Sequence, residues 1–500
     1  MATQKVASSV IGFNDMSRDC RSVDPLSTAA GKMASPRFHR LTFSGCRIKH
    51  LIMRLYHPSA FDFTTTVPSY WEASADPLGR PTPSLDGTHT ADVVVIGGGY
   101  AGLHAALQLT QAHGLAVCVL EAGDIGWGAS GRNGGFCCPG STKLSYSQLT
   151  ARFGLEETKR FHTAQRDAVG FVGEFLKANG IDAERSGDGE LQVAHKPSRI
   201  EELKHEQAFM RDTFGTASTF LTRQDLAERG NDSAVFQAGL LSDTTFGLHP
   251  LKYVRGLARA AIDAGVTVFS NSEVTGWEQN AGAHTLKTRN GQVTAKTVLV
   301  ATNGYTDETL PAGLGGRLLP ALTRIIVTRP ISDNELKAQG WTRSDPSYDT
   351  RNLLHYFRLL PDNRFMFGGR GGTDASPRGM KTIVQSLRAS FESIFPRLAH
   401  VETDYSWGGL VCLTSSRTPF AGPIDGMSNV WGAFGWHGNG VAMASYAANR
   451  LADVIAGTKR HDEALPAIMR TLPGRFVLPS LRVQYLKAAY LGYGAADNWR

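Results

Sequence analysis

Three short apolar runs along the chain are rich in β-branched residues, at residues 93–96, 116–120 and 297–301. Continuous apolar runs of this length are typical of strands that are buried on both faces of a parallel sheet. Between the first two runs, residues 100–111 have the pattern of a helix, and Gly114 closes it. The pattern therefore predicts a strand–helix–strand unit near residue 100.

The remainder of the chain alternates helical and strand-like segments. Apolar spacing and end signals predict helices over residues 154–179, 197–214, 250–264, 382–395, 440–456 and 480–491. Strands are predicted at residues 191–194, 266–269, 272–278, 323–328, 355–360 and 364–367, and Asn290-Gly291 predicts a hairpin turn. Residues 311–404 thus have a mixed pattern that differs from the α/β pattern before them.

The first apolar run leads directly into Gly97-Gly98-Gly99-Tyr100-Ala101-Gly102, which is G-x-G-x-x-G. Gly97 permits the tight turn, Gly99 lets a pyrophosphate approach the backbone, and Gly102 lets the helix pack close to the strand. The helix N-terminus offers unpaired N–H groups to phosphates. Glu121 follows Gly102 by 19 residues, where an acidic side chain can bind ribose hydroxyls. Strand, motif, helix, strand and acid in this order predict a dinucleotide site.

The continuation of the motif indicates which dinucleotide is bound. Residues 121–135 contain six glycines, and such a segment can direct backbone N–H groups at a large ligand. This stretch resembles the FAD-dependent amine and amino-acid oxidases of the D-amino-acid-oxidase type, which include sarcosine and glycine oxidases. Its G-A-S-G-R-N-G-G sequence is most similar to the branch of gamma-glutamylputrescine oxidase.

The resemblance implies an α/β fold with a Rossmann-like FAD-binding domain built from discontinuous segments, and an α+β substrate domain with a mixed or antiparallel sheet. We expect the FAD-binding domain at residues 91–181, 241–310 and 405–460, and the substrate domain at 182–240 and 311–404. Residues 53–90 would be an N-terminal arm and linker, and 461–500 a C-terminal tail or helix. The FAD contacts expected are Gly97, Gly99, Tyr100, Ala101, Gly102, Glu121, Ala122, Gly128, Ala129, Ser130, Arg132, Asn133, Gly134, Gly135, Val274, Thr302, Gly304, Gly438, Asn439, Gly440 and Val441.

The second glycine cluster, Gly438-Asn439-Gly440, opens the last of the predicted central helices. Relatives place this turn at the flavin pyrimidine edge, where reduction leaves negative charge that N–H groups can stabilise. An ordinary helix cap is the alternative. Some sarcosine-oxidase relatives bind the flavin covalently through a histidine in this region. No histidine occurs in residues 128–135, so we expect non-covalent FAD. For Cys412 two alternatives remain, covalent attachment of the flavin or an inert buried thiol. Cys137-Cys138 could form a vicinal disulfide or serve only in packing.

Amine oxidation needs hydride removal from the carbon beside a neutral nitrogen and requires no metal, and the chain shows no metal-binding motif. Arg358 and Arg370 could pair with a substrate carboxylate, or each could form a structural ion pair. His437 beside the glycine turn is an active-site candidate or a core histidine. The substrate-site candidates are His437, Arg358, Tyr356 and Arg370, together with Tyr305, His355 and Trp407.

The charge of +7 is concentrated at the N-terminus, since residues 1–52 carry eight Lys or Arg and three acids. The body of the protein therefore lacks a basic signature for nucleic acid. Residues 1–52 could be a mitochondrial transit peptide, a disordered extension, or sequence upstream of a true start near Met53. Six cysteines without framework spacing suggest reduced thiols and a cytoplasmic protein, and no apolar run is long enough to span a membrane.

The function expected from the resemblance is oxidation of the C–N bond of an amine or amino acid to an imine, with hydrolysis to a carbonyl product. Molecular oxygen would be reduced to hydrogen peroxide. The partners are then a small amine or amino-acid substrate and O2. The alternatives are a dehydrogenase that passes electrons to a quinone or protein, and a non-catalytic FAD-binding subunit of a larger assembly.

Overall fold

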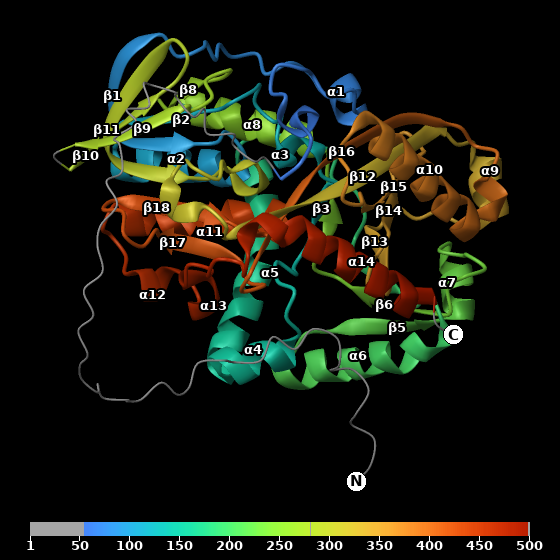
Figure 1. Ribbon diagram of the computed structural model, residues 1–500. Coiled ribbons are helices and arrows are strands. Elements are labelled where there is room, and N and C mark those ends of the chain that lie inside the picture. Colours follow the sequence, from blue (N-terminus) through green and yellow to red (C-terminus); the bar gives the residue numbers. More distant parts are fainter. Residues whose placement is uncertain (1–54, 281, 499–500) are drawn as a thin grey trace, which may run out of the picture. The chain divides into compact units, whose positions relative to one another are not determined.

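The computed structural model describes residues 55–280 and 282–498, so the predictions for residues 1–52 lie outside the described residues. One sheet has the order β17-β18-β11-β1-β2-β8, and β10 and β9 extend it from β11 (Figure 1). β1 runs parallel to both β11 and β2, as the apolar runs predict. The strands are β1 (Gly87–Ile96), β2 (Val117–Leu120), β8 (Thr267–Phe269), β9 (Gly276–Asn280), β10 (Ala283–Lys287), β11 (Gly291–Val300), β17 (Phe420–Pro423) and β18 (Val430–Phe434).

Helices cover this sheet and form the main core with it. α2 begins at the end of β1 and packs against α11 and α8, and α5 packs against α11. The buried side chains of these helices join those of β1 and β2 in one apolar cluster that includes Leu103, Val119, Tyr253 and Leu451. The helices are α2 (Tyr100–His113), α4 (Tyr146–Phe153), α5 (Leu155–Ala178), α8 (Pro250–Asp263), α11 (Gly440–Ile455), α12 (His461–Ala464) and α13 (Ala467–Arg470).

A second sheet has the order β16-β12-β15-β14-β13-β4-β6-β5. One face carries a core of aromatic rings around Phe357, Phe365 and Phe367, which α10 covers with Phe391. Its strands are β4 (Glu190–Val193), β5 (Ser218–Thr222), β6 (Ala238–Ser242), β12 (Leu318–Pro330), β13 (Ser347–Asp349), β14 (Tyr356–Leu359), β15 (Arg364–Arg370) and β16 (Thr403–Thr414). The helices around it are α6 (Ile200–Phe214), α7 (Arg223–Arg229), α9 (Asp333–Gln339), α10 (Pro377–Ile394) and α14 (Arg482–Asn498).

The opposite face of the second sheet is defined by strand register. Trp407, Ile325, Gly368, Tyr356 and Tyr348 are consecutive partners across β16, β12, β15, β14 and β13. Side chains alternate between faces along a strand, so residues two positions away share this face. Arg370 and Thr323, which pair with each other, therefore lie on the same face as Tyr356. We call this the inner face of the second sheet.

The predicted fold class is confirmed, and several element bounds differ from the sequence patterns. β12 and α14 are longer than predicted, and β5, β6 and β16 had no clear apolar pattern to predict them. β16 pairs along its length with β12, so residues 405–414, expected in the FAD-binding domain, join the second sheet. Gly408 and Gly409 interrupt the apolar pattern of β16, which is why the strand is hard to see in the sequence.

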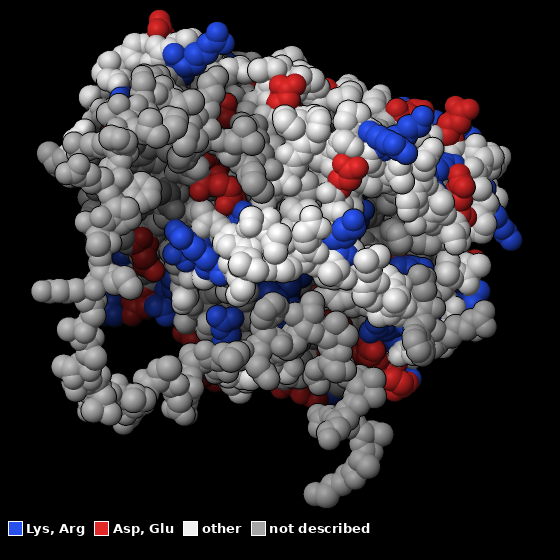
Figure 2. Space-filling model, in the orientation of Figure 1, with Lys and Arg blue, Asp and Glu red and all other residues white. Residues whose placement is uncertain are grey.

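Figure 2 shows basic and acidic side chains interspersed on one face of the molecule, without a continuous basic area. No helix among residues 55–280 and 282–498 is long and apolar enough to cross a membrane.

Candidate functional site

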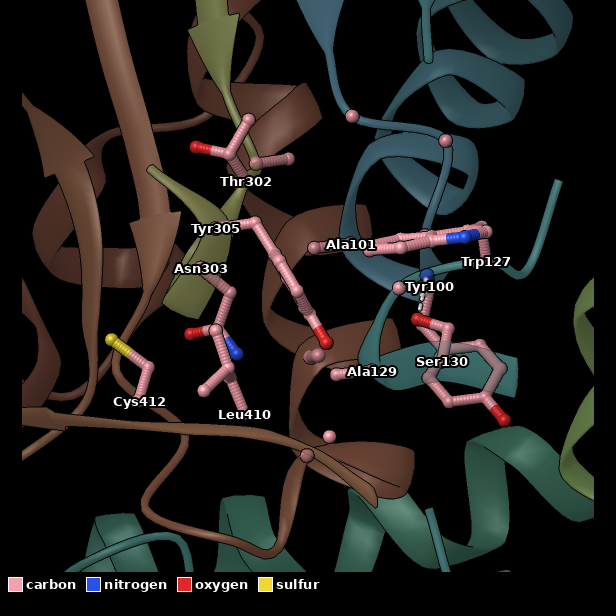
Figure 3. A pocket seen from close by; sticks show the side chains of 18 of the residues that line it. Tyr100, Ala101, Trp127, Ala129, Ser130, Thr302, Asn303, Tyr305, Leu410 and Cys412 are labelled. Carbon is pink, nitrogen blue, oxygen red and sulfur yellow. Dashed lines mark hydrogen bonds between the residues drawn. The ribbon is translucent and has the colours of Figure 1, made fainter. Parts of the chain in front are cut away.

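A cavity extends from the glycine turn after β1 to the N-terminus of α11, and β12 and β16 close its other side (Figure 3). Its walls come from chain segments that are far apart in sequence. The predicted FAD contacts that line it are Gly97, Gly99, Tyr100, Ala101, Glu121, Ala122, Gly128, Ala129, Ser130, Arg132, Asn133, Val274, Thr302, Gly438, Gly440 and Val441. Lining residues that sequence reasoning missed include Phe63, Trp127, Asn303, Leu410, Val411 and Trp436.

The glycine turn has the geometry that its motif predicts. A Cβ on Gly102 would lie 1.9 Å from the Gly97 carbonyl oxygen, so only glycine allows this contact between helix and strand. Gly97 has a φ of +107°, which other residues rarely adopt. Gly99 precedes α2, has an ordinary φ of −90° and lines the cavity, and a Cβ there would lie 2.7 Å from Ser130 Oγ.

The glycine segment after β2 is tied to this turn. The Ser130 hydroxyl accepts a hydrogen bond of 3.0 Å from the Tyr100 N–H, a bond that Figure 3 marks. Residues 129–132 of this segment form the short helix α3 (Ala129–Arg132). The Asn133 side chain bonds to the Ala129 and Ser130 carbonyls and accepts from the Gly135 N–H.

Glu121 is partly buried at the end of β2, and backbone groups hold its carboxylate. It accepts hydrogen bonds from the Gly98 N–H at 2.6 Å and the Gly123 N–H at 3.1 Å. Burial raises the pKa of the carboxyl group, and these N–H donors oppose the shift. The side chain thus joins the two glycine segments at the edge of the cavity, where a ribose hydroxyl could also reach it.

Two buried polar atoms on the cavity wall have no hydrogen-bond partner among the described residues: Nη2 of Arg132 and the hydroxyl of Tyr305. The Arg132 guanidinium lies over the Trp127 ring at 3.8 Å and donates to the Trp127 and Gly408 carbonyls with its other nitrogens. Figure 3 shows the Tyr305 side chain reaching across the cavity toward Ala129. Unpaired buried donors are unfavourable, so a ligand that accepts hydrogen bonds fits this wall.

The cavity therefore fits a flavin dinucleotide. The glycine turn and the N-terminus of α2 suit a pyrophosphate, Glu121 suits a ribose, and the unpaired donors suit a large ligand with many acceptor atoms. Within residues 55–280 and 282–498, no cluster of His, Cys, Asp and Glu has the arrangement of a metal site.

The second glycine turn lies at the other end of the cavity. α11 starts at Gly440 without a side-chain cap, so its first N–H groups are free to meet a ligand. The Asn439 side chain donates to the Pro139 and Gly140 carbonyls at 3.0 Å, which fixes the turn to the segment after β3 (Phe136–Cys137). The Gly435 N–H donates to Asn303 Oδ1 at 2.9 Å, which ties this end to the turn after β11.

Some predicted FAD contacts lie behind the cavity wall. Gly135 has a φ of +71° and no room for a Cβ beside the Leu248 carbonyl, and Gly134 contacts the Tyr356 ring. Gly304 packs against Leu410, and the Asn439 side chain donates to the Pro139 carbonyl. The residues placed outside the lining are Gly102, Gly134, Gly135, Gly304 and Asn439, and all of them shape the segments that form it.

Arg358 has a structural position that the sequence did not indicate. Its side chain is 1% exposed, and its guanidinium donates to the Gly134 and Leu248 carbonyls at 3.1 and 2.6 Å and to Ser186 Oγ at 3.2 Å. Burial lowers its pKa to about 10. Arg358 belongs to β14, so these hydrogen bonds join the second sheet to the glycine segment after β2. Its role is therefore structural.

His437 and Cys412 are both buried. His437 is 0% exposed, its Nε2 lies 3.2 Å from Thr414 Oγ1, and burial followed by the nearby Lys143 cation lowers its pKa to about 3, so the ring is neutral. Cys412 lines the cavity, and burial raises its pKa to about 12. Cys118, Cys137, Cys138 and Cys412 are free, buried thiols, so Cys137 and Cys138 serve in packing and the alternative of a vicinal disulfide falls away.

Arg370 and Lys143 lie near the cavity without an acidic partner among the described residues. Arg370 pairs through β15 with Thr323, a lining residue, on the inner face of the second sheet. Lys143 lies shortly after Gly140, whose carbonyl accepts from the Asn439 side chain. The backbone N–H of Lys143 donates to the Arg417 carbonyl at 2.9 Å. Desolvation by the surrounding atoms, with the Arg370 cation next, lowers the pKa of Lys143 to about 7, although its side chain keeps contact with solvent. Sequence reasoning missed Lys143, because no motif distinguishes it from a surface lysine.

The other substrate-site candidates lie around these cations. Tyr356 contacts Phe136 edge-to-face at 5.7 Å, and burial raises the pKa of its hydroxyl while Arg370 opposes the shift. Trp407 is buried and donates to the Arg132 carbonyl at 2.9 Å. His355 points to the opposite face of the sheet, where it stacks on Phe367 and bonds to Asp349 at 3.0 Å. Of the predicted substrate-site residues on this sheet, Arg370 and Tyr356 therefore lie on the inner face with side chains available to a ligand.

The fold and the cavity define a flavin-dependent oxidoreductase. Residues 92–454 match the family model described as DAO, FAD dependent oxidoreductase, and the chain belongs to this family. It is 32% identical to the gamma-glutamylputrescine oxidoreductase of Escherichia coli, covering 79% of this chain and 90% of that protein. It is 30% identical to the probable oxidoreductase OrdL of Haemophilus influenzae, covering 75% and 85%. The solved structure of glycine oxidase from Geobacillus kaustophilus matches with a TM-score of 0.61 at 20% identity, covers 75% and 96% of the chains, and shows the fold alone.

Proposed function

We propose that the chain oxidises the C–N bond of an amine or amino acid with non-covalent FAD and uses O2 as electron acceptor. The observation that carries the proposal is the cavity, which starts at a dinucleotide turn and ends below the inner face that bears Arg370. Similarity to gamma-glutamylputrescine oxidoreductase supports an amine with a carboxylate elsewhere in the molecule as the substrate.

Bound FAD would supply a hydride acceptor for the carbon beside a neutral nitrogen, and water would hydrolyse the iminium ion left on the substrate to a carbonyl compound and the released amine or ammonia. The protein residues hold the reactants and exclude water. Trp407 and Trp71 pack edge-to-face at 5.8 Å and close the interior behind the glycine segment. Arg370 and Lys143 supply positive charge that suits a substrate carboxylate, because neither is neutralised by an acid among the described residues.

The decisive experiment is anaerobic reduction of the bound flavin by a panel of gamma-glutamyl amines, polyamines and N-methyl amino acids. We expect loss of the flavin absorbance with an amine that carries a carboxylate, and oxygen uptake with peroxide release in air. Reduction without oxygen uptake would indicate a dehydrogenase. Bound flavin that no amine in the panel reduces would contradict the proposed function and favour a non-catalytic subunit.

Acid precipitation should release the flavin from the protein. Cys412 lines the cavity, but burial raises its pKa to about 12, and attachment needs the thiolate. Mass spectrometry of the denatured chain should therefore give the mass of the polypeptide alone. A mass increase equal to FAD that disappears in Cys412→Ser would overturn the prediction of non-covalent binding.

Binding of benzoate, a simple carboxylate probe, should weaken as the pH rises through about 7. Lys143 has a pKa lowered to about 7, so its positive charge is lost progressively as the pH rises through that value. Among its neighbours, His437 stays neutral and the Cys138 thiol stays protonated, because burial shifts their pKa values out of this range. The dissociation constant, followed by flavin absorbance between about pH 6 and about pH 9, should lose this step in Lys143→Met.

Glu190 provides the matched control for this titration. Burial raises its pKa to about 7 as well, and it hydrogen-bonds to Cys138. If Lys143 causes the pH step, Glu190→Gln should retain it. A step that Glu190→Gln removes and Lys143→Met keeps would assign the effect to the carboxylate instead.

A further inference from the structure

The C-terminal helix α14 lies outside the region that matches the family, which ends at residue 454. Figure 1 shows it crossing from the side of α11 toward β6. Leu486 and Tyr490 of this helix pack in one apolar cluster with Leu319 and Ala321 of β12 and Leu413 of β16. α14 therefore covers part of the second sheet with residues that lie outside the matched region.

The covered side chains lie on the inner face of the sheet. Leu319, Ala321 and Thr323 alternate along β12, so they project to the same side. Thr323 lines the FAD cavity and pairs with Arg370. The packing of Leu486 and Tyr490 thus continues the surface that carries Arg370.

The hydroxyl of Tyr490 is buried and has no hydrogen-bond partner among the described residues. Burial raises the pKa of this hydroxyl, and the Arg370 cation opposes the shift. A buried hydroxyl without a partner is unfavourable, whereas a hydroxyl and a guanidinium that share one acceptor are both satisfied. The Tyr490 hydroxyl and the Arg370 guanidinium are both donors, and together they suit a carboxylate.

The position of Tyr490 is fixed because contacts hold both ends of α14. Near the start, Arg482 is 2% exposed and pairs with Glu308 at 2.8 Å. Near the end, the Asp497 carboxylate accepts from the Asn352 N–H, the Asn352 side chain and the Leu353 N–H at 2.8, 2.7 and 3.0 Å. The helix therefore bridges the sheet as a fixed element and presents Tyr490 at a constant place.

We propose that α14 forms one wall of the substrate chamber and that Tyr490 donates a hydrogen bond to the substrate carboxylate that Arg370 binds. The part of this inference that concerns the substrate rests on the proposed function, whereas binding of a carboxylate by Tyr490 and Arg370 does not. It makes a residue outside the family region a determinant of substrate specificity. Amines without a carboxylate are expected to lose both contacts and to bind weakly.

The test measures binding of benzoate and of its neutral analogue benzamide through changes in the flavin absorbance of the holoenzyme. Tyr490→Phe keeps the ring and its packing and removes only the hydroxyl. Tyr493→Phe is the matched control, because Tyr493 lies on the same helix with 46% of its surface exposed. Arg370→Met removes the second contact. Benzoate should bind about tenfold more weakly to Tyr490→Phe, as expected for the loss of one hydrogen bond to a charged group. Its affinity for Tyr493→Phe should equal that of the wild type.

Benzamide should bind weakly and equally to all variants, and a substrate found in the amine panel should show a raised KM in Tyr490→Phe with kcat little changed. Equal benzoate affinity in wild type, Tyr490→Phe and Tyr493→Phe would overturn the inference, as would wild-type protein that binds no benzoate. A panel in which no amine reduces the flavin contradicts only the proposed reaction, because the benzoate measurement does not depend on turnover.

Discussion

Gly99→Val should yield a folded protein that is purified without flavin. Gly99 has a φ of −90°, so valine causes no backbone strain. A Cβ there would lie 2.7 Å from Ser130 Oγ, and the branched side chain would enter the cavity beside the N-terminus of α2. A displaced pyrophosphate that loses two charge-assisted hydrogen bonds costs about 3–6 kcal/mol, which is about a hundredfold or more in affinity. Flavin absorbance per chain measures the loss.

Gly170→Val is the matched control for the same substitution. Gly170 is exposed on α5, and a Cβ there meets nothing within 4 Å. This variant should keep both its flavin and its circular dichroism spectrum. Stoichiometric flavin in Gly99→Val would show that the first glycine turn does not hold the pyrophosphate.

Gly440→Val should retain FAD but lower the midpoint potential of the flavin. A Cβ on Gly440 would lie 3.1 Å from Trp436 Cβ, so a branched side chain displaces the start of α11, whose free N–H groups face the cavity. Losing one donor that stabilises negative charge costs about 1.5–3 kcal/mol. Since 30 mV corresponds to about 1.4 kcal/mol for a two-electron couple, the potential should fall by roughly 30–65 mV. The sulfite adduct, which is also anionic, should weaken in parallel.

Titration against a reference dye measures the potential, and Gly170→Val again serves as the control. Asn439→Ala offers a second comparison, because it removes the tether to Pro139 and Gly140 without adding bulk to the helix start. Its potential should fall less than that of Gly440→Val. An unchanged potential in FAD-replete Gly440→Val would mean that the turn is only a helix cap.

The sequence by itself was sufficient for features that depend on neighbours along the chain. The β1–α2–β2 unit is contiguous, and its glycines are required by contacts within that unit, such as Gly102 against the Gly97 carbonyl. The apolar runs that predict β1, β2 and β11 are uninterrupted because these strands are buried on both faces. The position of Glu121 after β2 follows from the same short-range order.

Only the tertiary structure decided which distant side chains meet. Arg358 and Arg370 look equivalent in sequence, yet three partners from other segments bind Arg358, while the register of β15 on β12 brings Arg370 beside the cavity. Lys143 and Tyr490 belong to segments with no motif. Their environment depends on long-range packing, which hydrophobic periodicity does not encode because it records only which face of an element is buried. The cofactor class was therefore readable in the sequence, whereas the side chains that meet the substrate required the fold.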